Sequence, residues 1–252
     1  MRRVAQIILK WHSTMECARL NRYGLLTVTG ADARDFLHAQ LTNDIANLPP
    51  DRAALAGWCM AKGRLLASFL VIPSKEGFLL QVARDLAPAV AKRLSMFIFR
   101  SKVKITDESD AWAQYGIWDA DLKVDGVAWD GDTVAVRVGE RRFLKISKGE
   151  AESCVQGEDA WTLQEIRAGR PLISAATQDQ FVPQMVNLEL IGGVNFQKGC
   201  YPGQEIVARA QYRGQVKRRL VHVHTNLKPG EQFNGGIVVD SAAGEALAVM
   251  PI

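Results

Sequence analysis

The sequence is poor in cysteine, and its cysteines are not paired. The four stand far apart, and none belongs to a C-x-x-C pair: Cys17, Cys59, Cys154 and Cys200. This spacing lacks the ligand pattern of a zinc site or of an iron–sulfur cluster held within the chain. A chain of 252 residues, 48% of them hydrophobic, needs no disulfide to bury a core. We therefore expect reduced thiols and a cytoplasmic protein.

Long hydrophobic runs and nucleotide-binding fingerprints are also missing. The N-terminus, "MRRVAQIILKWHSTMECARL", is basic, but its apolar run is short and interrupted. It lacks the apolar centre of a secretory signal, and no later run reaches membrane-spanning length. There is no P-loop, dinucleotide fingerprint or G-x-S-x-G element. A net charge of only +4 does not favour wholesale binding to nucleic acid, so we expect neither a membrane nor a nucleic-acid partner.

The chain mixes strand and helix patterns without regular alternation. Alternating apolar residues predict strands over 24–30, 54–60, 64–74, 77–83, 112–118, 126–131, 133–139 and 141–147. The C-terminal stretches 218–226 and 235–252 are β-rich. Helical spacing predicts helices over 31–45, 86–99, 158–169 and 203–213. Strands and helices that do not alternate strictly are typical of the α+β class, which we expect here.

One stretch, "KGCYPGQEIVARAQYRGQVKRR" at 198–219, combines a thiol with six basic residues and a single acid. Pro202 is a natural first residue for the helix that follows, so Cys200 stands just outside a helix N-terminus. Lys198 lies two residues away along the chain. Both the helix N-terminus and the lysine favour ionisation of the Cys200 thiol to a thiolate. The alternative is that Cys200 is only a small buried filler.

The predicted helix after this cysteine carries charges at regular spacing. Glu205 and Arg209 are four residues apart, the better orientation for an ion pair on a helix, and Arg213 extends the same face. The basic run 217–219 either guides an acidic partner or is an ordinary solvated face. Local chemistry alone leaves a site without a named ligand.

The segment "GGVNFQKGCYPGQEIVARAQYRG" closely resembles the signature of the YgfZ-type folate-binding proteins, relatives of the aminomethyltransferase (T-protein) of the glycine cleavage system. The match runs position by position from Lys198 to Arg213. Three further blocks are similar to this family: "ADARDFLHAQLTNDI", "CMAKGRLLASF" and "RAGRPLISAATQDQFVPQMVNLELIGGVNFQKG". The resemblance touches most of residues 24–220.

This resemblance implies a T-protein-like fold, with mixed α/β subdomains around a central funnel. It places a folate-binding region of two interleaved subdomains at 1–215 and a short C-terminal β domain at 216–252. It implies a tetrahydrofolate-binding accessory protein that supports assembly or repair of iron–sulfur proteins, including tRNA-modifying enzymes. The expected partners are a reduced folate and iron–sulfur client or assembly proteins. The alternative is a folate-dependent one-carbon transferase or demethylase.

The resemblance also implies site residues. The functional thiol is Cys200, assisted by Lys198. The expected folate-binding residues are Gln40, Asn43, Asp44, Lys62, Arg64, Asn187, Gln204, Glu205, Arg209 and Arg213. For Asn43 and Asp44 the alternative is ordinary helix-end chemistry, and the Lys62–Arg64 stretch can be a simple turn. His222 and His224 alternate on one strand face without an evident third ligand, so we expect no metal site.

Two departures from the family pattern bear on the activity. The strand that carries a pair of aspartates in the aminomethyltransferases reads Leu66-Ala67-Ser68 here, without a carboxylate to steer methylene transfer. This argues against glycine-cleavage activity, and the alternative transferase would need Glu205 or Asp44 as base. The family's acid in the helix before the proline is replaced by Arg167, while Glu165 lies on the other side of Ile166.

Overall fold

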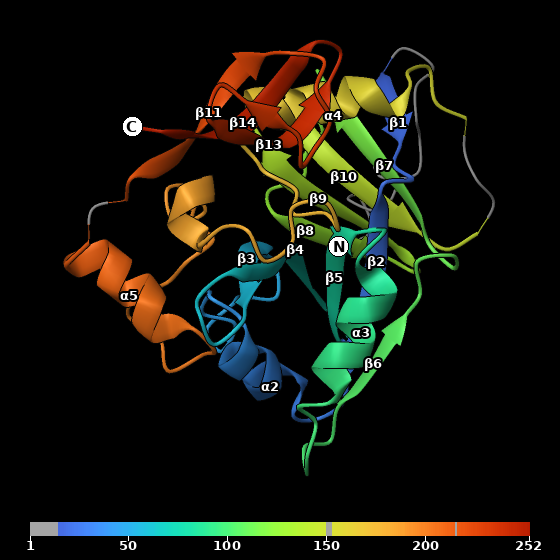
Figure 1. Cartoon of the computed structure of the whole chain (residues 1–252). Coiled ribbons are helices and arrows are strands. Elements are labelled where there is room, and N and C mark those ends of the chain that lie inside the picture. Colours follow the sequence, from blue (N-terminus) through green and yellow to red (C-terminus); the bar gives the residue numbers. More distant parts are fainter. Residues whose placement is uncertain (1–14, 150–152, 215) are drawn as a thin grey trace.

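A computed structural model describes residues 15–149, 153–214 and 216–252 of the chain (Figure 1). These residues form three antiparallel β-sheets with short helices around them. The first sheet has the order β3 (Ala54–Cys59), β4 (Leu65–Ser74), β5 (Gly77–Ala83), β2 (Tyr23–Thr29) and β6 (Lys104–Asp107). The second has the order β1 (Glu16–Arg19), β7 (Ala113–Trp118), β10 (Arg142–Ser147), β9 (Thr133–Gly139) and β8 (Val127–Asp130).

The third sheet is formed by the C-terminal part of the chain. Its order is β11 (Arg218–His224), β14 (Glu245–Pro251), β13 (Gly236–Ala242) and β12 (Gln232–Phe233). The helices are α2 (Ala33–Gln40), α3 (Ala87–Ser95), α4 (Glu158–Arg167) and α5 (Gln204–Tyr212), with a 3-10 turn η1 (Pro183–Val186). In Figure 1 the third sheet lies beside α4, whereas α5 lies at one side of the molecule.

The first two sheets interleave segments that are distant in sequence. Strand β1 precedes β2 in the chain but joins the second sheet, where Cys17 pairs with Ile117 of β7. The short strand is followed directly by β2, which pairs with β5 in the first sheet, Tyr23 opposite Ala83. This crossing fits two interleaved subdomains. The boundary proposed after residue 215 stays a prediction, although the strands of the third sheet all follow it.

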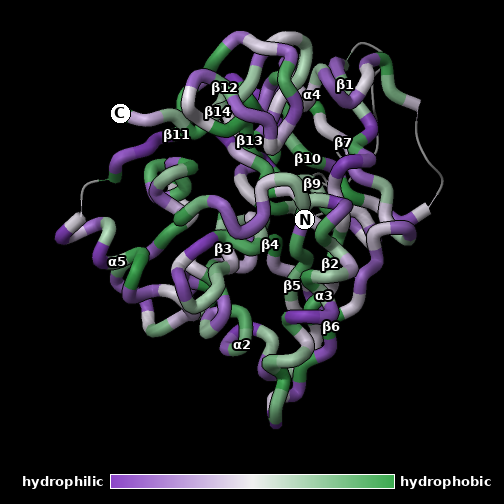
Figure 2. Tube along the Cα trace, viewed as in Figure 1, coloured by the Kyte–Doolittle hydropathy of each residue, from purple (hydrophilic) through white to green (hydrophobic). Residues whose placement is uncertain are grey.

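The core sits between the sheets and α4. Strand β4 is apolar along nearly its whole length and is buried on both faces, as a central strand requires. Trp161 of α4 packs closely against Gly116 of β7, where a Cβ would stand only 2.2 Å from its ring. Figure 2 shows the hydrophobic segments gathered among the central strands and the hydrophilic ones in the outer loops.

The sequence predictions located most elements, with corrections at their ends. The helix expected over 31–45 stops at Gln40, because Leu41 is extended and bridges Trp58 of β3. The helix expected over 86–99 ends at Ser95. The helix after the cysteine begins at Gln204, so Pro202 is not its first residue. The ends of these helices are set by contacts with distant segments, and the local spacing of apolar residues carries no information about such contacts.

Some short elements carried no sequence signal that we recognised. Strands β1, β6 and β12 and the turn η1 were not predicted, and the β-rich stretch 235–252 forms a hairpin of β13 and β14. Short edge strands have too few residues to show a period. Among the described residues, none of the helices has the length and hydrophobicity of a membrane span.

Candidate functional site

Two adjoining cavities form a funnel between the first two sheets. The outer cavity has a volume of about 430 Å³ and is lined by loop residues, β3, β9 and the segment after α4, a size that suits small organic ligands. The inner cavity is narrower, about 30 Å³, and reaches β2, β4 and β5. Both are lined by Leu55, Leu70, Arg170 and Ile191, so the inner space continues the outer one.

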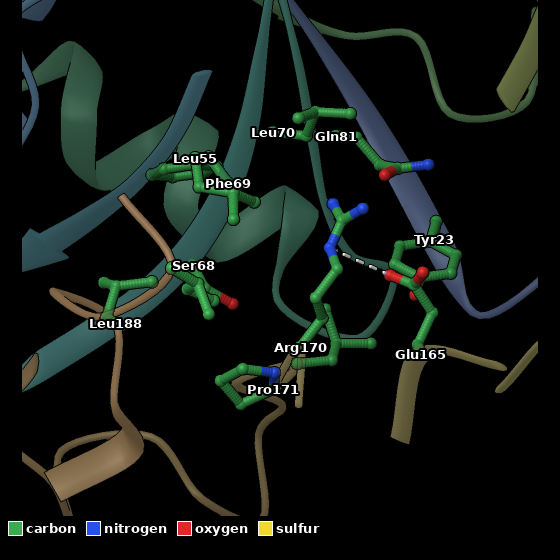
Figure 3. A pocket seen from close by; sticks show the side chains of 12 residues that line it. Tyr23, Leu55, Ser68, Phe69, Leu70, Gln81, Glu165, Arg170, Pro171 and Leu188 are labelled. Carbon is green, nitrogen blue, oxygen red and sulfur yellow. Dashed lines mark ion pairs between the residues drawn. The ribbon is translucent and has the colours of Figure 1, made fainter. Parts of the chain in front are cut away.

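A buried carboxylate between two arginines stands in this funnel. Glu165, in the last turn of α4, is only 7% exposed. Its Oε1 accepts a hydrogen bond from Arg142 Nη1 at 2.7 Å. Its Oε2 lies 3.3 Å from Arg170 Nε, the contact drawn in Figure 3. Arg142 also donates to the carbonyl of Gln164, 3.0 Å away. A carboxylate this deeply buried requires such partners to remain charged.

Arg170 is aimed into the funnel by the end of α4. Gly169 takes a positive φ of 64°, which ends the helix and turns the chain inward. Arg170 Nη1 then donates to the carbonyl of Val138 at 3.0 Å. Its Nε is buried, and the 3.3 Å approach to Glu165 is not aligned as a hydrogen bond. Figure 3 shows the guanidinium standing between Glu165 and the Leu70–Gln81 wall.

Besides Glu165 and Arg170, the polar groups of the funnel include the phenol of Tyr23 and the guanidinium groups of Arg142 and Arg137. Burial, reinforced by the nearby Glu165, raises the pKa of Tyr23, so its phenol keeps its proton. Burial also lowers the pKa of Arg142, although Glu165 opposes this shift. Arg137 lines the outer cavity from β9 and is exposed. With three arginines and one glutamate, the funnel has a cationic lining that favours an anionic or acceptor-rich ligand.

Most of the residues that the sequence analysis expects to bind a folate lie outside the funnel. Of the ten expected folate-binding residues, only Asn43 lines either cavity. Its amide donates to the carbonyls of Leu55 at 2.6 Å and Gly192 at 2.8 Å, which fixes the mouth of the funnel. The arginines of the funnel were missed. The available signal was "AGRP", an arginine held between a helix-ending glycine and a proline.

The structure also explains the rearranged "EIRAG" segment. Arg167 lies outside the funnel, where its guanidinium binds Glu245 of β14 through contacts of 2.6 to 3.2 Å. Glu165 is the acid that faces inward. On β4, Ser68 accepts a hydrogen bond from the backbone N–H of Ile173 at 3.1 Å and lines the inner cavity. Strand β4 thus offers a hydroxyl and no carboxylate at this place.

Cys200 lies in an exposed loop before α5, and it is the most accessible cysteine. Cys17 and Cys59 are buried, and burial raises the pKa of Cys59 to about 12. Lys198 is buried instead of facing solvent, and its ammonium donates to the carbonyls of His38 and Leu41 at the end of α2. This burial lowers the pKa of Lys198 to about 8, opposed by Asp44 and Cys200.

The turn Lys62–Arg64 packs against the cysteine loop. A Cβ on Gly203, whose φ is 81°, would stand 2.4 Å from the carbonyl oxygen of Met60, so the two backbones meet directly. Lys62 and Arg64 are exposed, and Arg64 donates to the carbonyl of Asp179 at 3.0 Å. The structure therefore joins two blocks that the sequence analysis singled out separately.

The other predicted folate-binding residues line neither cavity of the funnel. Asp44 accepts hydrogen bonds from Asn47, and Gln40 ends α2. Asn187 follows η1 in a left-handed conformation and donates to the carbonyl of Leu220 at 2.9 Å, a structural contact. Gln204 is the first residue of α5. Their role toward a folate stays a prediction.

The ion pair expected on α5 is not formed. Glu205, Arg209 and Arg213 are exposed, and no contact joins Glu205 to Arg209 in the described structure. Water stabilises exposed charged side chains nearly as well as an ion pair between them would. Arg219 of the basic run contacts the carboxylate of Glu189 within the chain, so only part of that run faces solvent.

One of the two strand histidines, His222, contacts an acid. His222 Nε2 lies 2.7 Å from Glu245 Oε2, and the rings of His222 and His224 are 5.4 Å apart. Across the part of the chain that the structure describes, no group of three or more metal-ligating side chains is found.

Comparison with known proteins identifies relatives over most of the chain. The tRNA-modifying protein YgfZ of Vibrio atlanticus is 32% identical over 238 residues, which cover 88% of this chain and 74% of that protein. The protein of the same name from Serratia proteamaculans is 33% identical over 236 residues, covering 83% and 71%. No family model matches the chain.

The fold has a solved counterpart. The crystal structure of the glycine cleavage system aminomethyltransferase T from Bartonella henselae superposes with a TM-score of 0.73 at 16% identity, covering 98% of this chain and 81% of that one. This likeness concerns the fold, and it confirms the expected T-protein-like α+β architecture. Together with the identity to its relatives, it leads to one assignment: the chain belongs to the family of the tRNA-modifying protein YgfZ.

Proposed function

We propose that this protein binds a reduced folate in the funnel and serves as an accessory factor for iron–sulfur proteins, including tRNA-modifying enzymes. The observation that carries the folate part is the buried group Arg142–Glu165–Arg170 at the junction of the two cavities. The relatives' name, tRNA-modifying protein, supports the link to tRNA modification. The exposed thiol of Cys200 supplies the reactive group.

The chemistry of a folate matches the lining of the funnel. A pterin presents N–H donors along one edge, which suit a carboxylate such as Glu165, and a flat apolar body that suits Leu55, Leu70 and Ile191. The glutamate tail of a folate is anionic. Arg137 at the exposed rim can meet this tail, because a guanidinium and a carboxylate can form two parallel hydrogen bonds.

The test is an anaerobic calorimetric titration of tetrahydrofolate into the purified protein. We expect micromolar binding to the wild type and binding at least about tenfold weaker to Glu165→Gln, a loss of about 1.4 kcal/mol. Glu140→Gln, which removes the same charge from an exposed turn, should bind normally. Because Glu165→Gln leaves two arginines without their acid, Ile191→Trp serves as a second variant that fills the funnel. Normal binding to both variants would disprove this location.

The accessory role has a separate test in a strain that lacks the protein. Cys200→Ala removes one small exposed group, so it should fold normally yet fail to restore the activity of iron–sulfur enzymes. Cys154→Ala, a change at a half-buried cysteine, should restore it. Full restoration by Cys200→Ala would refute the thiol role.

The alternative, a one-carbon transferase or demethylase, would require a carboxylate next to the reacting folate nitrogen. Ser68 stands on β4 without a neighbouring acid on that strand, and Glu165 is engaged by two arginines. We therefore favour the accessory role. Turnover of a methylated amine in the presence of tetrahydrofolate would reverse this preference.

A further inference from the structure

We propose that a third cavity, separate from the funnel, binds an organic cation of the polyamine class in a corner formed by two tryptophans. This cavity has a volume of about 710 Å³, within the range of small-molecule sites. No residue lines both this cavity and the funnel. The proposal is therefore independent of folate binding.

The third cavity lies farther along the strands of the first sheet than the funnel does. Tyr23 on β2 lines the inner cavity of the funnel, whereas Thr27 and Thr29 line the third cavity. Alternate residues of a strand share a face, so these three side chains lie on one face of β2. Leu25 lies between them on the same face and is fully buried. The packed core therefore separates the two sites.

Two tryptophans form a corner of the third cavity. The ring planes of Trp112 and Trp129 are 82° apart, and their ring centroids lie 6.5 Å from each other. Trp112 Nε1 donates to Glu108 Oε2 at 2.7 Å, and Trp129 Nε1 donates to the carbonyl of Pro73 at 2.9 Å. Because both indole N–H groups are engaged, the rings are held in place before a ligand arrives, and the corner offers aromatic surface to that ligand.

The side chain of Lys148 shows that this corner accepts an ammonium group. Its Nζ lies 4.8 Å from the centroid of the Trp112 ring, a distance at which a cation is attracted by the ring. The same Nζ lies 3.9 Å from Glu108 Oε2, too far for a hydrogen bond. The Lys148 side chain is also 46% exposed, so its ion pair with Glu108 is weak. An external ammonium group can therefore take the place of Lys148, whose side chain then turns to solvent.

The charge and polarity of the lining favour a cation with several ammonium groups. The charged side chains are three acids and two lysines: Glu76, Glu108, Asp132, Lys75 and Lys148. An anionic ligand would meet this excess of negative charge. The hydroxyl groups of Thr27 and Thr29 can accept hydrogen bonds from N–H groups, and Phe78 and Leu79 add apolar surface. A polyamine alternates ammonium groups with alkyl segments, so it matches both kinds of surface.

A titration of spermidine into the full chain tests the proposal by NMR. The signals to follow are the indole N–H signals of the six tryptophans, of which Trp112→Phe and Trp129→Phe identify the two at the cavity. At constant ionic strength we expect these two signals to shift together and to reach half-saturation at about 1 mM spermidine or below. The absence of a saturable shift in both signals would overturn the proposal.

The alternative is that Lys148 completes the corner and no ligand binds there. Removal of its ammonium group distinguishes the two cases. Lys148→Met frees the Trp112 ring, so spermidine should bind at least about threefold more tightly than to the wild type. Lys75→Met removes the same charge from the turn between β4 and β5, which also lines the cavity, and it should gain less. Weaker binding to Lys148→Met, or an equal gain in both variants, would refute the displacement of Lys148.

The contribution of the acid is tested by Glu108→Gln. The amide oxygen of glutamine can still accept the N–H of Trp112, but the loss of charge should weaken spermidine binding by about threefold to fivefold. Glu140→Gln changes an exposed turn outside the cavity and should bind like the wild type. Inorganic phosphate is the opposite probe. If phosphate shifts the two tryptophan signals and spermidine does not, the cavity is an anion site and the proposal fails.

Discussion

Lys198 is a buried cation whose ammonium group lies against the carbonyl end of α2. The site suits a positive charge, because the last carbonyls of a helix carry a partial negative charge. The same burial removes the ammonium from water and lowers its pKa to about 8. Lys198 therefore links the cysteine loop to the end of α2.

This lowered pKa predicts a pH dependence of stability. The folded chain releases the Lys198 proton at about pH 8, whereas the unfolded chain keeps it up to about pH 10.5. Between these values the unfolded state binds more protons, so this lysine makes stability rise with pH. In urea unfolding at about pH 7.5 and about pH 10, the free energy of unfolding of the wild type should rise relative to Lys198→Met. The exposed Lys62→Met provides the control, and a constant difference for Lys198→Met would contradict the prediction.

At the scale of elements, α5 and the turn between β3 and β4 meet at two glycines. Gly63 and Gly203 both have a positive φ, 74° and 81°. A Cβ on Gly203 would stand 2.4 Å from the carbonyl of Met60 and 2.8 Å from the Cα of Gly63. The glycines in "AKGR" and "YPGQE" therefore permit the close approach of the cysteine loop to the turn between β3 and β4.

Substitution at Gly203 separates backbone strain from this contact. Gly203→Ala should destabilise the protein by clearly more than the about 1 kcal/mol expected for a positive φ alone, because backbone atoms cannot move aside easily. Gly235→Ala is the matched control: its φ is 80° and nothing lies within 4 Å of the added Cβ. Urea unfolding of both variants measures the difference. Equal losses of unfolding free energy in the two variants would show that the close approach of the two backbones adds no cost.

At the scale of the whole molecule, a buried ion pair joins the C-terminal sheet to the rest. Arg22, just before β2, binds Asp240 of β13 at 2.7 Å and Thr162 of α4 at 2.8 Å. Asp240 is 1% exposed. Burial raises the pKa of Asp240 despite the opposing effect of Arg22. One side chain thus links three distant parts of the sequence.

Removal of this arginine should loosen the C-terminal sheet. Arg22→Met leaves the Asp240 carboxyl buried without its partner, which we expect to cost about 3 kcal/mol. The double variant with Asp240→Asn should recover part of the loss. Arg52→Met breaks the exposed pair with Asp125 and should have no measurable effect. Thermal unfolding compares the variants, and an unchanged midpoint for Arg22→Met would argue against the link.

The sequence by itself determined the α+β class, most strands and helices, and the family signature from Lys198 to Arg213. These features are local, because period and turn chemistry act within a few residues. Strand β5 and strand β9 match their predicted bounds for this reason. Short edge strands such as β1 depend on a distant partner, so they escaped prediction.

Only the tertiary structure decided which polar groups face the funnel. Glu165 and Arg167 are two residues apart, roughly 200° around a helix, so one points inward to Arg142 and the other outward to Glu245. Likewise, Lys198 meets the carbonyl of His38 across 160 positions of the chain. Such choices follow from how the sheets and α4 pack, because burial and charge pairing are settled between segments that the sequence keeps far apart.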